Sequence, residues 1–414
     1  MALTKLQFKP GINRDITSYA NEGGWVDCDK VRFRLGYPEV IGGWEKLTDQ
    51  TYVGTVRGLH NWVALDGSDF LGLGTELKYY IEEGQQFYDI TPIRKTSTNS
   101  ITFSATNGSS TITVTDTSHQ AVQNDFVTIS DAVSLGGNIT AAVLNQEYQI
   151  DAILTANTYT ITAKDTSGAT VTANASDSGN GGSGVDGSYQ INVGLNTGVG
   201  GTGWGAGTWG RGTWGSAAAS SVSTQLRIWS HDNFGEDLII NPRDSGIFYW
   251  DKSDGLTARA VNITDISGAS NPPTIAKQVL VSDNDRHVIA FGVDAINIGE
   301  QDPLLIRFSS QESPTDWTPS STNTAGDLRI GSGSEFVRAI ETKREIVIFT
   351  DSSMHSMRFI GPPFTFGISP ISTNTTIMGP NAAVAVDDAI FWMGRQNFYV
   401  YTGKTQQIPC TVRE

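Results

Sequence analysis

The chain has 414 residues, more than one hydrophobic core normally serves, so its length predicts several domains or an array of repeats. Only 17% of the residues are charged, glycine occurs 45 times, and no stretch has the periodicity of a long amphipathic helix, which together indicate an all-β protein with many tight turns. The formal net charge of −15 argues against conventional sequence-specific binding of nucleic acid, because such binding relies on a basic surface.

Residues 1–50 predict an extended N-terminal arm. Apolar residues, among them Trp25 and Trp44, are scattered between turn signals such as Gly42-Gly43 and Gly36-Tyr37-Pro38. This pattern has too little periodicity for a core of its own, so we expect the arm to lie across another surface of its own chain or of a neighbouring subunit. Trp25 and Trp44 are candidate anchors of a subunit interface, where tryptophan is enriched.

Residues 51–95 predict the first blade of a β-propeller. Apolar stretches at about 56–65, 70–75, 77–81 and 87–90 are separated by turn residues. Four short strands in about forty residues match the size of one blade.

Residues 96–190 have a different composition, rich in Thr, Ser, Ala and Asn and without tryptophan. About seven short alternating segments predict a compact, immunoglobulin-like β-sandwich. Because blade-like sequence flanks this segment on both sides, we interpret it as an inserted domain.

Residues 191–221 predict a glycine-rich loop with three aromatic anchors. Trp204, Trp209 and Trp214 recur every five residues, a spacing that fits neither a helix face nor a strand face. Two interpretations stay open: the tryptophans dock into their own or an adjacent subunit, or they stack on sugar rings of a glycan. We favour subunit-interface anchors, because aromatic anchors are common at protein interfaces.

Residues 222–414 predict the remaining blades. The stretch 226–251 contains two strand patterns around the turn Asn241–Gly246, and its aromatic residues Phe248, Tyr249 and Trp250 are interpreted as packing between blades. Similar units follow, giving about five meanders in the chain, spaced as propeller blades are. The fold class is therefore predicted as an all-β propeller of four-stranded meander blades, partial or open in this chain. The chain is either an open circle or a fragment of a longer polypeptide.

The sequence offers no motif for catalysis, cofactor binding or metal binding. The five histidines do not cluster at the spacing of metal ligands, and each is expected to be an ordinary strand or turn residue. The run Ser230-His231-Asp232 is not evidence of a catalytic triad, because a triad is a spatial arrangement. Acidic pairs near Asp283 and Asp387 lack the spacing of a calcium loop, which favours turns. We therefore expect no enzymatic activity, no cofactor and no metal.

The two cysteines, Cys28 and Cys410, are too far apart in sequence to indicate a disulfide framework. No secretory signal is expected behind Met1, and no window approaches the ~18 apolar residues of a membrane span. These features predict a soluble protein made in a reducing cytoplasm. Its acidity has two open interpretations, ordinary solubility or a wall that repels an anionic polymer.

Four segments carry a family likeness. They are FKPGINRDITSYANEGGWVDCDKVRFRLGYPEVIGGW at 8–44, NFGEDLIINPRDSGIFYWD at 233–251, IRFSSQESPTDWTPSSTNTAGDLRI at 306–330 and GPNAAVAVDDAIFWMGRQNFYVYTG at 379–403. Together they resemble the tail nozzle proteins of short-tailed bacteriophages, also called tail tubular protein B or packaged-DNA stabilisation protein. The likeness covers most of the chain outside the insertion.

The resemblance implies a structural virion protein made in the host bacterial cytoplasm and located in the phage tail. Its partners would be further copies in a hexameric ring, the head-to-tail adaptor protein, tail fibres, and genomic DNA that passes through the lumen without sequence-specific contacts. Family members tend to be longer, which agrees with a fragment. Two alternatives stay open: a receptor- or glycan-binding tail protein that uses the insertion and the tryptophan loop, and a propeller hydrolase acting on cell-surface polysaccharide.

Overall fold

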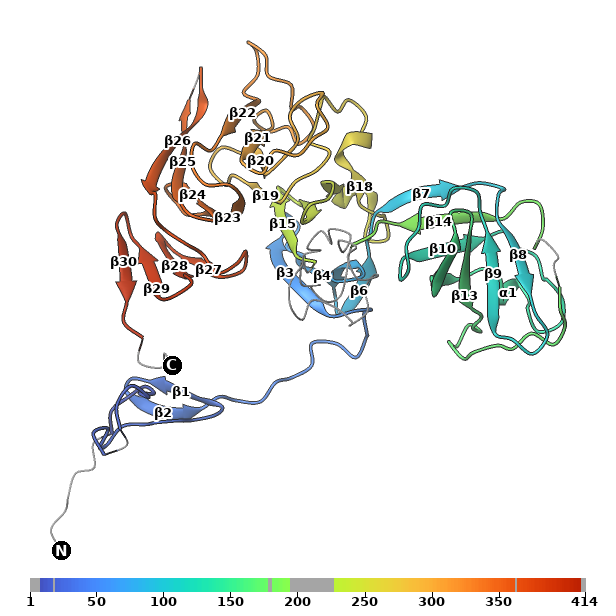
Figure 1. The fold of residues 1–414 in the computed structure, drawn as a ribbon, viewed down its shortest axis with the longest axis horizontal. Coiled ribbons are helices and arrows are strands. Elements are labelled where there is room, and N and C mark those ends of the chain that lie inside the picture. Colours follow the sequence, from blue (N-terminus) through green and yellow to red (C-terminus); the bar gives the residue numbers. More distant parts are fainter. Residues whose placement is uncertain (1–7, 18, 178–180, 194–226, 362, 411–414) are drawn as a thin grey trace, which may run out of the picture. The chain divides into compact units, whose positions relative to one another are not determined.

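The computed structural model describes residues 8–17, 19–177, 181–193, 227–361 and 363–410 (Figure 1). Within them the strands form seven four-stranded antiparallel sheets and one two-stranded hairpin, which confirms the predicted all-β class. The chain divides into two compact units. One contains Gln50–Asp302 and Arg307–Asp327, and the other contains Met1–Asp49, Pro303–Ile306 and Leu328–Glu414.

Five of the sheets are meanders whose strands neighbour one another in sequence order, the topology of a propeller blade. We call them blades 1 to 5. Blade 1 contains β3 (Val56–Val63), β4 (Asp69–Thr75), β5 (Tyr79–Glu83) and β6 (Gln86–Asp89). Blade 2 contains β15 (Trp229–Phe234), β16 (Asp237–Pro242), β17 (Phe248–Trp250) and β18 (Val261–Asn262), with 3₁₀ turns at Lys252–Asp254 and Ile263–Asp265. Blade 3 contains β19 (Gln278–Val281), β20 (Val288–Phe291), β21 (Leu305–Phe308) and β22 (Gly326–Arg329). Blade 4 contains β23 (Phe336–Glu341), β24 (Ile346–Thr350), β25 (Met354–Gly361) and β26 (Thr365–Ser372). Blade 5 contains β27 (Ala383–Val386), β28 (Ala389–Met393), β29 (Phe398–Tyr401) and β30 (Thr405–Ile408).

The segment between blades 1 and 2 forms a sandwich of two further sheets. One sheet has the order β11-β10-β14-β7, from Glu147–Gln149, Phe126–Ser130, Asp186–Gln190 and Ile93–Ser97. The other has the order β12-β13-β9-β8, from Ala152–Thr155, Thr158–Thr162, Thr111–Thr115 and Thr102–Ala105. Buried residues from both sheets, such as Val114 and Val127, belong to one core cluster. The short helix α1 (Ala141–Leu144), capped by the Thr140 side chain, was not predicted, because four residues are too few to show a helical period.

Blades 1 and 2 share one core although the inserted domain separates them in sequence. Trp62, Trp229 and Trp250 are buried in the same cluster, and the Trp229 indole N–H donates to the carbonyl of Thr75 over 2.6 Å. The burial of Phe248 and Trp250 in this cluster confirms their predicted role in packing between blades. For Tyr249 the prediction was wrong, because its side chain lies on the other face of β17 and its hydroxyl donates to Asp237 of the same blade. First strands β3 and β15 are neighbours in space, so the chain leaves blade 1, builds the sandwich and returns to the adjacent blade.

Blades 1 and 4 share one kind of hairpin turn. In blade 1 the Thr75 N–H donates to the Lys78 carbonyl, and in blade 4 the Thr350 N–H donates to the Ser353 carbonyl, both over 2.8 Å. Each bond closes the turn between the second and third strands of its blade. The threonine hydroxyl then accepts from the backbone N–H of Lys78 or Ser353 at 2.9 Å. Such a side-chain-supported turn recurs because both blades need the same tight reversal.

Among the described residues, no helix has the length and apolar character needed to cross a membrane.

Gly74 of blade 1 lies directly against the Trp229 ring of blade 2. A Cβ at this position would lie 2.5 Å from Cδ1 of Trp229, whose ring is held in the shared core. We expect Gly74→Ala to lower the free energy of unfolding by about 1–3 kcal/mol, the range for overpacked cores. Chemical unfolding followed by tryptophan fluorescence measures this change. Gly331→Ala is the control, because a Cβ there meets nothing within 4 Å. Equal effects of both substitutions would contradict the proposed contact.

Candidate subunit interface

The N-terminal arm is built on a short hairpin. Strand β1 (Val31–Arg34) pairs antiparallel with β2 (Tyr37–Val40), and the reversal occurs at Leu35 and Gly36, both with positive φ. Of the predicted turn signal Gly36-Tyr37-Pro38, Gly36 lies in the turn, whereas Tyr37 and Pro38 begin β2. Proline is tolerated in β2 because this two-stranded sheet consists only of edge strands.

The two predicted anchors in the arm have different surroundings. The Trp25 ring lies 5.8 Å from the Phe8 ring and 6.2 Å from the Phe33 ring, measured between centroids, so it holds the arm together. Trp44 is 99% exposed and lies in residues 41–51, which form no strand or helix. Their role as subunit anchors stays a prediction, and Trp204, Trp209 and Trp214 lie outside the described residues.

Exposed apolar side chains are concentrated in the arm. Tyr19 is 94% exposed and Leu35 is 92% exposed, in addition to Trp44. Tyr37, Val40, Ile41 and Leu47 are exposed as well. Isolated exposed apolar residues are normal, whereas a run of them in one short segment is typical of an interaction surface.

An apolar cavity of about 760 Å³ lies between the arm and blade 5. From the arm it is lined by Gly11, Ile12, Val31 and Phe33. From blade 5 it is lined by Asn381, Ala382, Ala383, Val384, Phe391, Trp392, Met393, Phe398, Tyr399, Ile408, Pro409 and Cys410. The arm thus faces this blade with the apolar side of β1, while Arg32 and Arg34 lie on the exposed side of the same strand.

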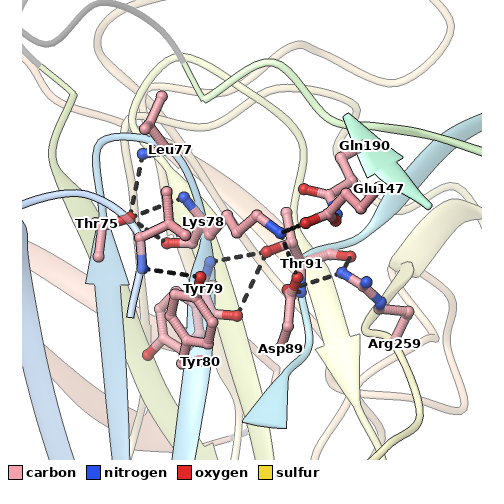
Figure 2. Close-up of polar contacts among 11 residues, drawn as sticks. Thr75, Leu77, Lys78, Tyr79, Tyr80, Asp89, Thr91, Glu147, Gln190 and Arg259 are labelled. Carbon is pink, nitrogen blue, oxygen red and sulfur yellow. Dashed lines mark hydrogen bonds and ion pairs between the residues drawn. The ribbon is translucent and has the colours of Figure 1, made fainter. Parts of the chain in front are cut away.

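A second candidate region joins the inserted domain to blades 1 and 2 through charged side chains grouped around the buried Lys78 (Figure 2). The Lys78 Nζ atom lies 2.7 Å from Asp89 Oδ2 and 2.6 Å from Glu147 Oε2, and its side chain is only 3% exposed. Arg259 Nη1 lies 2.7 Å from Asp89 Oδ1, and Gln190 Nε2 donates to Glu147 Oε1 over 2.6 Å. We call these five residues the junction network. Two cations and two carboxylates balance each other, so no uncompensated charge is buried.

Each element contributes to the junction network from a defined position. Lys78 follows the Thr75 turn into β5, and Asp89 ends β6. Glu147 begins β11 and Gln190 ends β14, so both come from the inserted domain. Sequence reasoning missed this site, because its members are single polar residues on separate strands. The only available signal was a lone lysine in the apolar run Leu77-Lys78-Tyr79-Tyr80-Ile81.

The pKa of Asp89 reflects these contacts. Burial alone would raise the pKa of this carboxyl, but the charges of Lys78 and Arg259 outweigh burial and lower it below its usual value. A lowered folded-state pKa means that the stabilising contribution is present at neutral pH and is lost as pH falls through that pKa. The Asp89 carboxylate is therefore ionised at neutral pH, where its contacts with Lys78 and Arg259 contribute to stability.

Replacing Lys78 with methionine tests the network. Lys78→Met removes the shared cation and leaves Glu147 paired only with Gln190, so we expect the free energy of unfolding to fall by about 2–4 kcal/mol. Chemical unfolding at pH 7 measures the loss. Lys343→Met is the matched control: Lys343 pairs with Asp387 at 3.1 Å, but both side chains are largely exposed, and a change below about 0.5 kcal/mol is expected. A loss no larger than that of the control would contradict the assignment.

The histidines of the described residues take structural positions. His231 Nδ1 lies 2.9 Å from the Tyr79 hydroxyl and its Nε2 lies 3.1 Å from the Leu59 carbonyl oxygen, which ties blade 2 to blade 1. His355 Nε2 lies 2.9 Å from Ser353 Oγ. Ser353 is only 1% exposed, so this Ser–His pair has no surface from which a substrate could reach the hydroxyl. Among the described residues, no group of three or more His, Cys, Asp or Glu side chains could hold a metal ion.

Asp232 is a partly buried carboxylate between the first strands of blades 2 and 3. Its Oδ2 accepts from the Val281 backbone N–H over 2.9 Å and its Oδ1 accepts from the Asn233 N–H over 3.0 Å. Burial raises the pKa of Asp232 to about 6, and these two hydrogen bonds only partly oppose the shift. Because the folded-state pKa is above the unfolded value, the associated stability is complete in acid and is lost as pH rises through 6.

A pH series on Asp232→Asn tests this shift. Asparagine resembles the protonated acid, so the stability of the wild type relative to Asp232→Asn should fall by about 1–2 kcal/mol between pH 4 and pH 8. This figure is smaller than the full shift implies, since the side chain retains 25% exposure. Chemical unfolding of both proteins at several pH values measures the difference. Parallel pH profiles would contradict it.

Comparisons with known proteins do not assign this chain to a family. No protein-family model matches the chain, and no curated protein matches it. Among solved structures, the chain is similar to the phage phi92 endosialidase, with 10% sequence identity and a TM-score of 0.25. The match covers 86% of this chain and 55% of the endosialidase chain. A likeness at this level assigns neither a family nor an activity.

Proposed function

We propose that the protein is a structural subunit of the tail of a short-tailed bacteriophage. In this proposal its copies form the hexameric nozzle ring that retains genomic DNA, conducts it during ejection and supports tail fibres. The observation that carries the proposal is the arm, in which Tyr19, Leu35 and Trp44 are more than nine-tenths exposed. A protein that acts as a monomer gains nothing from such a segment, whereas a subunit of an assembly buries it against a partner.

Two further features support this function. The residues at 8–44, where the exposed arm lies, are among those that resemble the nozzle family. The net charge of −15 also suits a conduit for DNA, because like charge keeps the polymer from adhering to the wall. The inserted domain, held by the junction network, is the proposed contact for tail fibres or the head-to-tail adaptor.

We also propose that the chain does not act as an enzyme. Among the described residues, the Ser353–His355 pair is buried and the charged residues of the junction network neutralise one another. These arrangements support packing and not turnover of a substrate.

Mass photometry of the full-length chain mixed with tail adaptor rings tests the proposal. We expect a ring-shaped assembly of six copies, visible by negative-stain electron microscopy, and phage particles without this protein should fill with DNA and then leak it. A chain that stays monomeric in the presence of adaptor rings would contradict the nozzle function. Glycan-array binding that is lost on Trp209→Ala would instead favour the receptor-binding alternative.

A further inference from the structure

Blade 5 has two apolar faces, of which blade 4 covers only one. Ile390, Trp392 and Tyr401 are buried with Ile340 and Phe349 of blade 4 in one core cluster. The alternate residues point to the opposite face, since side chains alternate along a strand. We call that opposite side the outer face of blade 5.

The strand register shows that the outer face is continuous and apolar. Val384 pairs with Phe391, Met393 pairs with Phe398, and Phe398 pairs with Ile408. Residues paired in register share one face of a sheet, so these five side chains form one patch across all four strands. Val384 is 56% exposed and Phe391 is 39% exposed, although both have an apolar neighbour directly opposite.

The arm is the element placed opposite this patch. All five patch residues line the cavity of about 760 Å³ together with Val31 and Phe33 of β1. Because this cavity is open to solvent and lined mainly by apolar side chains, the arm of the same chain covers the patch incompletely. The patch therefore has the apolar character of a docking site, and the arm of the same chain does not fill it.

The segment between the arm and blade 1 bears on whether the arm that fills the patch belongs to the same chain or to a second copy. Residues 41–51 have no regular structure, and Ile41, Trp44 and Leu47 are exposed within it. From Tyr52 onward the chain is held on blade 1, where the Tyr52 ring lies 5.2 Å from the Phe87 ring and the Val53 N–H donates to the Tyr80 hydroxyl over 3.2 Å. A segment of eleven extended residues reaches at most about 35–40 Å, enough to cross to a neighbouring subunit.

We propose that the outer face of blade 5 is the docking site for the N-terminal arm of a second copy of this chain. An arm from a second copy presents the same apolar side of β1 to this face, but its position is set by the neighbouring subunit, so it need not leave the same cavity. A head-to-tail series of such exchanges can close into a ring. It also places the exposed residues of 41–51 at the boundary between subunits, where they become buried. The inference rests on the proposed ring function and identifies the contact that builds the ring.

The two native cysteines allow a direct test, because each is on one side of the contact. Cys410 lines the cavity, and Cys28 lies three residues before Val31, within about 11 Å of chain. Single-cysteine chains, Cys28→Ser and Cys410→Ser, are coexpressed, assembled and treated with a flexible bismaleimide. We expect a covalent dimer that contains one chain of each kind, at least severalfold more abundant than the dimer from either variant alone. The wild type should give a ladder of covalent multimers.

A matched pair of substitutions controls for general effects on assembly. Val384→Asp places a charge in the patch and should lower the yield of the mixed dimer severalfold. Val261→Asp, at a residue of similar exposure in blade 2, should leave the yield unchanged. Both substitutions are made in the single-cysteine chains.

Two outcomes would overturn the proposal. If crosslinks form only within single wild-type chains, the arm stays on blade 5 of its own chain. If no combination of chains gives a crosslink, the arm does not dock on this face. If rings form with adaptor proteins while the mixed dimer is absent, the nozzle function stands and only this interface fails. If no oligomer forms at all, the nozzle function itself fails.

Discussion

Lys78 is the residue on which the arrangement of blade 1, blade 2 and the inserted domain depends. A buried ammonium group is tolerated only beside compensating charge, and Asp89 and Glu147 supply it from two different domains. Arg259 then joins blade 2 to the same carboxylate of Asp89. Apolar contacts would allow the sandwich to shift across the blades, whereas paired charges with short, directional contacts favour one orientation.

The same constraint explains how a domain can be inserted into a meander array without disrupting it. Trp62 and Trp250 lie in one core although the sandwich separates their strands in sequence. Because β7 and β14 pair with each other, the chain leaves and re-enters the array at one place. The sandwich has its own core, so the blade array and the insertion are stabilised separately and meet at the junction network.

Blade 5, the last in sequence, has one incompletely covered face, which bears on assembly. A blade in the middle of an array buries both faces against neighbours, but blade 5 covers one face with blade 4 and faces a loosely apposed arm with the other. An apolar sheet face cannot be left in water without cost. The exposed arm and the partly covered blade therefore carry complementary apolar surfaces, and the proposed pairing between copies would link the fold to the proposed ring.

The sequence by itself determined the elements: the meander spacing, the segment that folds as a sandwich, and an arm without a core of its own. These follow from local signals, namely alternation of apolar residues and turn residues between them. Only the tertiary structure decided which residues meet. Lys78 and Glu147 are 69 positions apart, and no local pattern relates them. The contrast between Trp25, packed on Phe8 and Phe33, and Trp44, exposed to solvent, also depends on long-range packing. Periodicity reports which face of a strand is apolar, but the neighbour that covers that face is set by contacts between distant parts of the chain.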